Sequence, residues 1–161
     1  PVKGRMEKVT GECGFTVIID YAHTPDGLEN IIHTAKGFAR GRVITLFGCG
    51  GDRDRTKRAV MGGISGKFSD YTVITSDNPR TEEPFCVIAD IYEGIKDTKG
   101  EYCIIPDRKM AIGHALSIAR EGDVVLLAGK GQEDYQIIGN EKIHFDEREI
   151  VDEYMKNRRD K

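Results

Sequence analysis

The run Val124-Val125-Leu126-Leu127-Ala128 contains five apolar residues in succession and no polar one. A short apolar run of this kind is typical of a strand that is buried on both faces, as the inner strands of a parallel sheet are. We therefore predict a central strand over residues 124–128. Gly129 and a polar segment follow it directly, so the strand should end in a loop.

Strand-like and helix-like segments alternate along the chain before this run. Thr24 and Pro25 fit the start of the first helix, because Thr is a good N-cap and Pro suits the first helical position. The alternation predicts βαβ units and therefore a Rossmann-like, doubly wound, mostly parallel α/β sheet. Strands are expected at residues 15–19, 43–47, 71–75 and 102–105, and apolar positions including Val60, Phe68, Val87, Ile91, Met110 and Leu116 mark helices between and after them.

The segment after Gly129 has a different pattern. Two strand-like runs within residues 136–145 flank a Gly139-Asn140 turn, which predicts a hairpin. We expect this hairpin to form an antiparallel edge of the sheet near the C-terminus, with a charged helix from Asp146 onward. Residues 3–12 are expected to add a further short strand.

Length and composition restrict the classes of protein to which the chain can belong. Its 161 residues fit a single domain, residues 1–161, that is large enough to bury a core. A net charge of −3, from 24 Lys and Arg against 27 Asp and Glu, offers no basic surface, so we expect no nucleic-acid partner. No apolar stretch approaches the ~20 residues that span a bilayer, so we expect no membrane partner and a cytoplasmic location.

Two further features shape these expectations. The chain begins at Pro1 and not at Met, which suggests a piece of a longer protein. The four cysteines form no Cys-x-x-Cys pair and have no histidine at ligand spacing, so we interpret them as reduced thiols and expect no metal site. They are Cys13, Cys49, Cys86 and Cys103.

Four polar loops follow predicted strands, at residues 20–25, 48–58, 77–81 and 129–134. Ligands of open α/β sheets bind beyond the carboxyl ends of the strands, so we expect these loops to lie on one rim and to form a binding site. Taken singly, each loop is equally consistent with an ordinary turn, because turns favour Gly, Asn, Asp and Pro for backbone reasons.

The tetrapeptide Asp77-Asn78-Pro79-Arg80 is the most informative of these loops. It places a carboxylate, an amide and a guanidinium where a strand ends. A carboxylate can bind an ammonium group and a guanidinium can bind a carboxylate with two parallel hydrogen bonds. This combination suits an amino acid as the ligand.

The glycine-rich loop Gly48–Arg55 resembles a phosphate cradle in its position between a strand and a helix, but not in its motif. Gly-x-x-x-x-Gly-Lys-Ser/Thr is absent from the chain and Gly-x-Gly-x-x-Gly is not completed in this loop, so neither ATP hydrolysis nor dinucleotide binding is supported. No Ser/His/Asp or Cys/His grouping can be defended from spacing, and we predict no catalytic residue in the chain. His23 is the one histidine in a strand-end loop.

Taken together, five ordered motifs resemble the C-terminal domain of the Mur ligases nearly from end to end, and most closely the branch that adds 2,6-diaminopimelate. One position departs from the family, because Gln132 stands where histidine is common. The motifs are Gly4-Arg5-Met6-Glu7, Asp20–Pro25, Gly48–Asp54, Asp77–Arg80 with Thr81–Pro84, and Gly129–Gln136.

The resemblance implies an ATP-dependent ligase of peptidoglycan synthesis that joins meso-diaminopimelate to UDP-N-acetylmuramoyl-L-alanyl-D-glutamate. ATP and Mg²⁺ would be bound mainly by a central ATPase domain, which, like the UDP-binding domain, has no counterpart in this chain. We therefore expect a monomeric domain that is inactive alone, binds the amino acid and completes the ATP site. The residues matching the family's amino-acid pocket are Arg53, Asp77, Asn78, Pro79, Arg80, Gly129 and Glu133, and those matching its nucleotide site are Arg5, Asp20 and His23.

Two alternatives remain open at this point. The first is a Mur ligase that adds lysine or another amino acid, against which Arg80 argues, because lysine lacks the distal carboxylate and would leave a desolvated guanidinium unpaired. The second is a non-enzymatic, Rossmann-like ligand-binding module, which the missing P-loop would favour.

Overall fold

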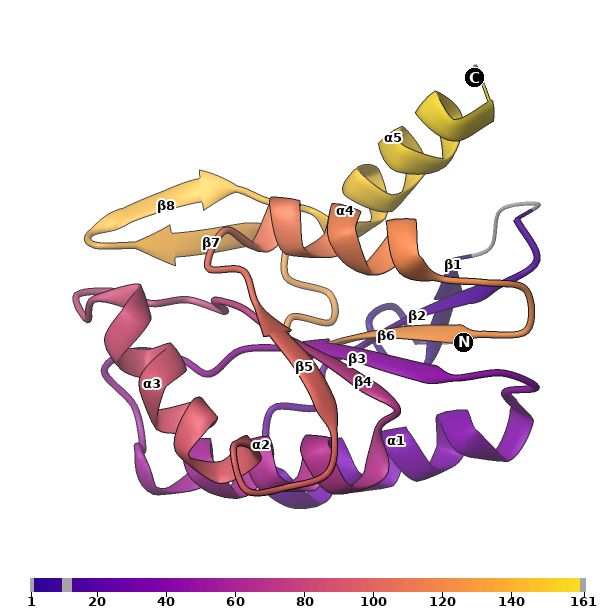
Figure 1. The fold of residues 1–161 in the computed structure, drawn as a ribbon. Helices are drawn as coiled ribbons and strands as arrows, with labels where there is room; N and C mark the ends of the chain where they lie inside the picture. The colour runs from indigo at the N-terminus through magenta and orange to yellow at the C-terminus, as the bar shows by residue number, and fades with distance from the viewer. Residues whose placement is uncertain (1, 10–12, 160–161) are drawn as a thin grey trace.

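The predicted central strand, β6 (Val124–Ala128), lies inside a six-stranded sheet with the order β1-β2-β6-β3-β4-β5 (Figure 1). The computed structural model describes residues 2–9 and 13–159. All neighbouring strands are parallel except β1 and β2. The other strands of the sheet are β1 (Glu7–Val9), β2 (Thr16–Asp20), β3 (Val43–Phe47), β4 (Tyr71–Ile74) and β5 (Glu101–Ile104).

Helices cover both faces of this sheet, as a doubly wound fold requires (Figure 1). Residues of β6 alternate between the two sides: Val124 and Leu126 join one core cluster, whereas Val125 and Leu127 join the other. The strand is therefore buried on both faces, which confirms the prediction. The first face carries α1 (Pro25–Phe38), α2 (Thr56–Phe68) and α3 (Pro84–Ile95), and the second carries α4 (Arg108–Ile118) and α5 (Glu147–Arg159).

The two residues that predicted the start of the first helix have the roles expected of them. The hydroxyl of Thr24 accepts a hydrogen bond from the N–H of Gly27 at 3.1 Å, and Pro25 begins α1. Two apolar residues that marked helices are exposed, however: Val60 is 52% exposed and Met110 68%. In α2 the face toward α3 is formed by small residues, because a Cβ at Gly62 would lie 2.2 Å from the carbonyl oxygen of Ile91.

The predicted hairpin is confirmed, with β7 (Tyr135–Ile138) antiparallel to β8 (Glu141–His144). It forms a two-stranded sheet of its own, and the antiparallel edge of the main sheet is β1 instead. The reason is that the chain leaves β6 across the carboxyl ends of the strands, where Ile138 bridges to Arg80. Of the strand expected within residues 3–12, residues 7–9 are observed, and residues 10–12 lie outside the described part of the chain.

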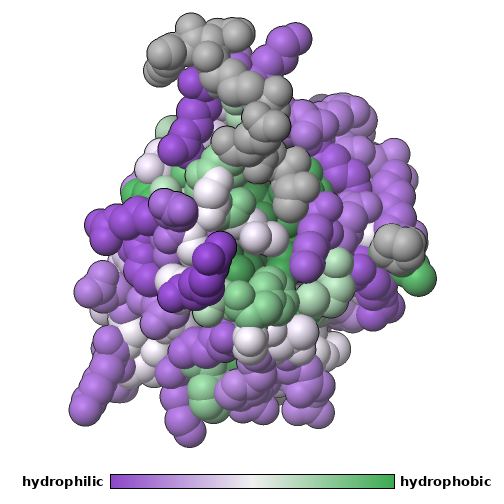
Figure 2. All heavy atoms as spheres, turned by 90° about the vertical axis from the view of Figure 1, so that its right-hand side faces the viewer, coloured by the Kyte–Doolittle hydropathy of each residue, from purple (hydrophilic) through white to green (hydrophobic). Residues whose placement is uncertain are grey.

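The amino ends of the strands are organised by Asp123. Its carboxylate accepts hydrogen bonds from the N–H groups of Arg42 and Arg120 and pairs with the Arg42 guanidinium at 2.8 Å. Burial acts to raise the pKa of Asp123, but these donors outweigh it and lower the pKa. Figure 2 looks onto this end of the molecule, where mostly hydrophilic side chains surround a smaller hydrophobic area.

In the described parts of the chain, no helix is both long and apolar enough to cross a bilayer.

Candidate binding site at the carboxyl rim of the sheet

A cavity of about 450 Å³ lies at the carboxyl ends of the strands. All four polar loops expected on this rim contribute to it, so the sequence predicted their meeting correctly. The volume is that of a small-molecule site. The lining residues are Tyr21, His23, Gly48, Cys49, Gly50, Arg53, Asp54, Lys57, Asp77, Asn78, Arg80, Gly129, Glu133 and Tyr135.

The glycine-rich loop and the tetrapeptide are bound to each other along one wall of the cavity. The N–H of Gly51 donates to the carbonyl of Asn78 at 2.8 Å, and Nη1 of Arg80 donates to the carbonyl of Gly51 at 3.0 Å. Glycine is required at position 51, because a Cβ there would lie 1.8 Å from the carbonyl oxygen of Pro79. The close approach explains why a glycine-rich loop stands here without a P-loop motif.

Arg80 has a left-handed backbone, with φ of +53°. Such a conformation costs a non-glycine residue about 1 kcal/mol or more and persists where neighbours hold it. The hairpin supplies that support, since the N–H of Arg80 donates to the carbonyl of Ile137 at 3.1 Å and the N–H of Gly139 donates to the carbonyl of Arg80 at 2.7 Å. The hairpin thereby directs the Arg80 side chain toward the cavity.

Asn78 joins the tetrapeptide to the loop after β6. Its Nδ2 donates to Oε1 of Glu133 at 3.2 Å, and its Oδ1 accepts from the N–H of Ile137 at 3.0 Å. Both ends of the amide are therefore used within the protein, which fixes its orientation. Glu133 is held in the wall of the cavity by this contact.

Asp77 is almost fully buried but remains incompletely paired. Its Oδ1 lies 3.4 Å from Nζ of Lys130 and accepts no hydrogen bond among the described residues. A Cβ built on Gly129 would lie 3.1 Å from Oδ2, so the glycine leaves that oxygen room. Because a buried carboxylate that lacks hydrogen bonds is costly and Oδ2 has room beside it, this group is suited to receive a further cationic donor.

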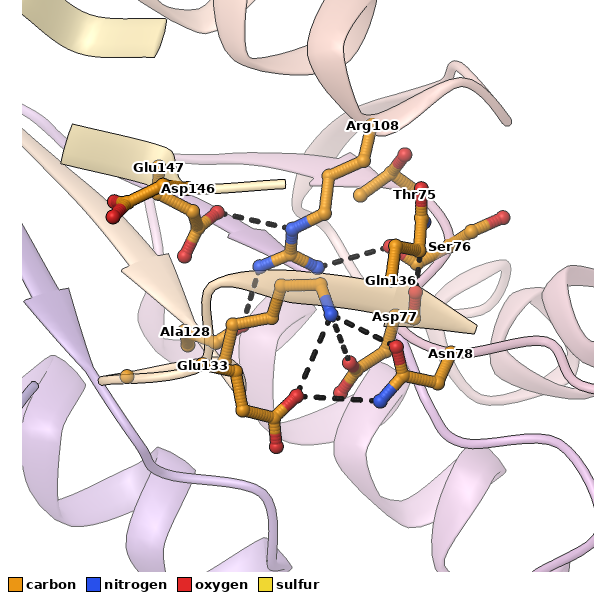
Figure 3. A network of polar contacts seen from close by, with 12 residues as sticks. Thr75, Ser76, Asp77, Asn78, Arg108, Ala128, Glu133, Gln136, Asp146 and Glu147 are labelled. Carbon is orange, nitrogen blue, oxygen red and sulfur yellow. Dashed lines mark hydrogen bonds and ion pairs between the residues drawn. The ribbon is translucent and has the colours of Figure 1, made fainter. Parts of the chain in front are cut away.

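Lys130 is a central member of the site that the sequence analysis missed. Its side chain is 0% exposed, and Nζ donates to Oδ1 of Asn78 at 2.9 Å and to the carbonyl of Tyr135 at 2.8 Å. In Figure 3 the side chains of Asp77, Asn78 and Glu133 converge on the point where these contacts place the ammonium group. Burial lowers the pKa of Lys130, and the charges of Asp77 and Glu133 offset part of that effect.

Two buried arginines hold the backbone of the same loops. Arg108 pairs with Glu147 at 3.0 Å and donates to the carbonyls of Ser76 and Ala128 (Figure 3). On the other side, the fully buried side chain of Arg58 donates to the carbonyl of Gly50 and pairs with Glu82 and Asp90. Sequence reasoning missed both, because Lys and Arg are almost never fully buried unless they are paired, and their partners are distant in sequence.

Arg53 and Pro79 take lesser parts in the geometry. Arg53 lines the cavity, but its guanidinium is exposed and donates to the carbonyl of Asp52 at 2.9 Å. Pro79 is not among the lining residues, and its carbonyl accepts from the N–H of Glu82. Of the seven residues matched to the amino-acid pocket, all but Pro79 therefore line one cavity.

The residues matched to the nucleotide site come from two segments that meet at Tyr21, the one before β1 and the end of β2 with the loop after it. His23 lines the cavity, whereas Arg5 and Asp20 do not. The guanidinium of Arg5 stacks over the Tyr21 ring at 5.4 Å, and the Asp20 carboxylate accepts from the N–H groups of Met6 and Ala22, each at 2.8 Å. An exposed arginine and histidine could meet a nucleotide here.

The donor set is poor for a metal ion. Within the described residues, no group of three or more His, Cys, Asp or Glu side chains could hold one. The sequence also contains no P-loop motif that would bind phosphate groups. The cavity is lined by charges of both signs: the carboxylates of Asp54, Asp77 and Glu133, the guanidinium groups of Arg53 and Arg80, and the ammonium group of Lys57. Such a cavity can bind the ammonium and the carboxylate of one small zwitterion.

The chain is similar to known proteins along most of its length. The family model described as "Mur ligase, glutamate ligase domain" matches residues 4–131. Over 154 residues the chain is 55% identical to a UDP-N-acetylmuramoyl-L-alanyl-D-glutamate–2,6-diaminopimelate ligase of Clostridioides difficile, and over 155 residues it is 57% identical to the enzyme of that name from Alkaliphilus metalliredigens. Both alignments cover 96% of this chain.

A solved structure carries the same description. A UDP-N-acetylmuramoyl-L-alanyl-D-glutamate–2,6-diaminopimelate ligase superposes on 98% of this chain with a TM-score of 0.92 and 37% sequence identity. The chain covers 32% of that structure, and 32% and 31% of the two curated relatives. It thus spans about a third of the length of the proteins it matches.

Proposed function

The chain belongs to the Mur ligase family, and on that premise we propose that it is the amino-acid-binding domain of an ATP-dependent ligase. The full-length enzyme would add meso-diaminopimelate to UDP-N-acetylmuramoyl-L-alanyl-D-glutamate in the cytoplasm, as a step of peptidoglycan synthesis. Relatives that are named for this reaction support the proposal. This chain would supply the pocket for the incoming amino acid.

One observation carries the proposal: the rim cavity places Arg80 and Asp77 together, with charges of opposite sign. meso-Diaminopimelate has two amino-acid centres, and its distal centre presents a carboxylate and an ammonium side by side. Arg80, with Arg53 beside it, would bind the carboxylate, and Asp77 and Glu133 would bind the ammonium. Lysine lacks the distal carboxylate and would leave Arg80 without an anion.

The other reactants would be held mainly outside this chain. ATP, when bound with Mg²⁺, activates the terminal carboxyl group of the UDP-linked dipeptide for attack by an amine. This chain would hold the amino acid that supplies the amine. Arg5, Asp20 and His23 would complete the nucleotide site from the rim, with Asp20 fixing the loop that presents His23. The domain alone is therefore expected to be inactive.

The test is the substitution Arg80→Ala in the full-length ligase. We expect KM for meso-diaminopimelate to rise by about 10- to 150-fold, because a charge-assisted pair contributes about 1.5–3 kcal/mol and Asp77 would not replace it. Arg55→Ala is the matched control, since Arg55 is exposed, lies outside the cavity and pairs weakly with Glu82 at 3.5 Å. An unchanged KM in Arg80→Ala would refute the proposed pocket.

A further inference from the structure

The ammonium group of Lys130 lies directly beneath the wall of the cavity that Asp77, Asn78 and Glu133 form. Its side chain is 0% exposed, so it cannot itself touch a ligand in the cavity. Its contacts are instead with groups of that wall: Asp77 at 3.4 Å, Asn78 at 2.9 Å and Glu133 at 3.5 Å. The lysine therefore acts on a ligand only through these residues.

The lengths of these contacts separate two roles of the lysine. Its short hydrogen bonds, 2.8 and 2.9 Å, go to uncharged oxygens of Tyr135 and Asn78, which any neutral donor could satisfy. The two carboxylates lie farther away: Glu133 accepts a long hydrogen bond of 3.5 Å, and Asp77 lies 3.4 Å from the ammonium group without one. What these carboxylates receive from Lys130 is therefore mainly positive charge, which they share.

This sharing sets the charge that a ligand meets. Asp77 and Glu133 together bring two negative charges to one wall, and Lys130 cancels one of them. The wall keeps a single net negative charge beside the positive Arg80. A wall of one negative charge next to one guanidinium is complementary to one ammonium next to one carboxylate.

We infer that Lys130 is a specificity-determining residue, which tunes the cavity to a zwitterionic amino-acid centre and against a ligand end that is only cationic. The inference rests on the proposed function. Without the lysine charge, two uncompensated carboxylates would attract any ammonium strongly, and the absence of a carboxylate on the ligand would matter less. Lysine would then compete better with meso-diaminopimelate.

The test compares kcat/KM for meso-diaminopimelate and for L-lysine in the full-length ligase. Lys130→Gln removes the charge but keeps an N–H donor for Asn78 and the Tyr135 carbonyl. We expect it to lower the diaminopimelate-to-lysine ratio of kcat/KM by about tenfold or more. Lys130→Arg is the matched control, which keeps the charge and should keep the ratio near that of the wild type.

Charge rescue separates this role from a structural one. Adding Glu133→Gln to Lys130→Gln restores a single negative charge, so the ratio should return toward the wild-type value, which a packing defect would not do. Glu133→Gln alone leaves no net charge on the wall and should raise the ratio, since lysine depends more on its ammonium. This variant tests the inference even where Lys130→Gln does not fold.

The outcomes distinguish the inference from the function on which it rests. A wild-type enzyme that does not use meso-diaminopimelate would overturn the proposed function and the inference with it. A wild-type enzyme that uses it, with a ratio that is unchanged in both Lys130→Gln and Glu133→Gln, would overturn the inference alone. Equal losses for both amino acids in Lys130→Gln, without rescue by the second substitution, would show a structural role and also overturn it.

Discussion

At the scale of single residues, the site depends on positions where the backbone has little freedom. Arg80 adopts a positive φ that the hairpin holds by two backbone hydrogen bonds. Gly51 lies so close to Pro79 that no side chain fits between them. The side chains that would meet a ligand are thus positioned by the main chain beneath them, and small changes there should have large effects on binding.

Gly51→Ala should displace the tetrapeptide. Its Cβ would meet the Pro79 carbonyl at 1.8 Å, and backbone cannot move aside as cheaply as a flexible side chain. We expect a loss of about 1–3 kcal/mol in the free energy of unfolding, measured by urea denaturation, and weaker amino-acid binding. Gly37→Ala in α1 is the control, where nothing lies within 4 Å of the added methyl and a gain of up to about 1 kcal/mol is expected. Equal effects of the two changes would contradict this account.

The sequence predicted the residues that line the cavity better than the charged residues beneath them. Asp77, Asn78 and Arg80 follow a strand in a polar loop, and that pattern indicates a rim site by itself. Lys130 and Arg58 could not be recognised, because a charged residue in a sequence is first expected at the surface. Their burial depends on acceptors from segments far along the chain, which local patterns do not reveal.

At the scale of elements, α5 is tied to the site through a buried ion pair, and its Arg148 also donates to the carbonyl of Gly131 at 3.0 Å. Glu147 in its first turn pairs with Arg108, which in turn holds the carbonyls of Ser76 and Ala128 next to the two loops of the cavity. The alternation of strands and helices predicted α4, and the charged segment from Asp146 onward predicted α5. The same alternation could not reveal that their contact supports the pocket, and it could not place the hairpin, whose position depends on Arg80.

Breaking the Arg108–Glu147 pair should be costly. Glu147→Gln leaves a buried guanidinium without its counter-charge, and we expect a loss of about 3–5 kcal/mol in the free energy of unfolding. Urea denaturation measures it, with Glu153→Gln as the control, because the Lys109–Glu153 pair is exposed and should contribute less than about 1 kcal/mol. The double variant Arg108→Met/Glu147→Met should lose less than the sum of its single variants. An additive result would show that the two side chains are not coupled.

The pair between His144 of β8 and Glu149 of α5 should make stability depend on pH. The Nε2 atom of His144 lies 2.8 Å from an oxygen of Glu149, and that hydrogen bond raises the pKa of His144 above 6.5 in the folded state. The contribution is therefore complete below pH 6.5 and is lost as the pH rises through the folded-state pKa. NMR titration of the imidazole should show the raised pKa, and Glu149→Gln should bring it down toward 6.5. The same pKa in both proteins would refute the pairing.

At the scale of the whole molecule, the two ends of the sheet have different tasks. The amino ends are closed by ion pairs such as Arg42–Asp123, whereas the carboxyl ends open into the cavity. β6 lies between β2 and β3, although it follows both in sequence, so the loops after these three strands become neighbours. The sequence predicted the site at the carboxyl ends, because the parallel direction of the strands follows from the alternation, but it did not predict the ion pairs at the amino ends.

Ligand binding should stabilise the whole chain. At about 100 times its Kd, a ligand adds about 2.7 kcal/mol to the free energy of unfolding. For a chain of 161 residues, that gain raises Tm by about 5–10 °C. We expect meso-diaminopimelate to produce this shift in a thermal unfolding experiment and L-lysine at the same concentration to produce a much smaller one. Equal shifts would favour a lysine-adding ligase, and no shift at high concentration would argue against a pocket preformed in this chain.

The bridge between Arg80 and Ile138 has a consequence for engineering. The tetrapeptide looks like a portable cassette, yet its arginine owes its backbone shape to a hairpin that follows more than fifty residues later. Transplanting residues 77–80 alone into a related scaffold would transfer the side chains without the hairpin that holds the backbone of Arg80. A successful graft must include residues 129–139 as well, so these two segments should be transferred together.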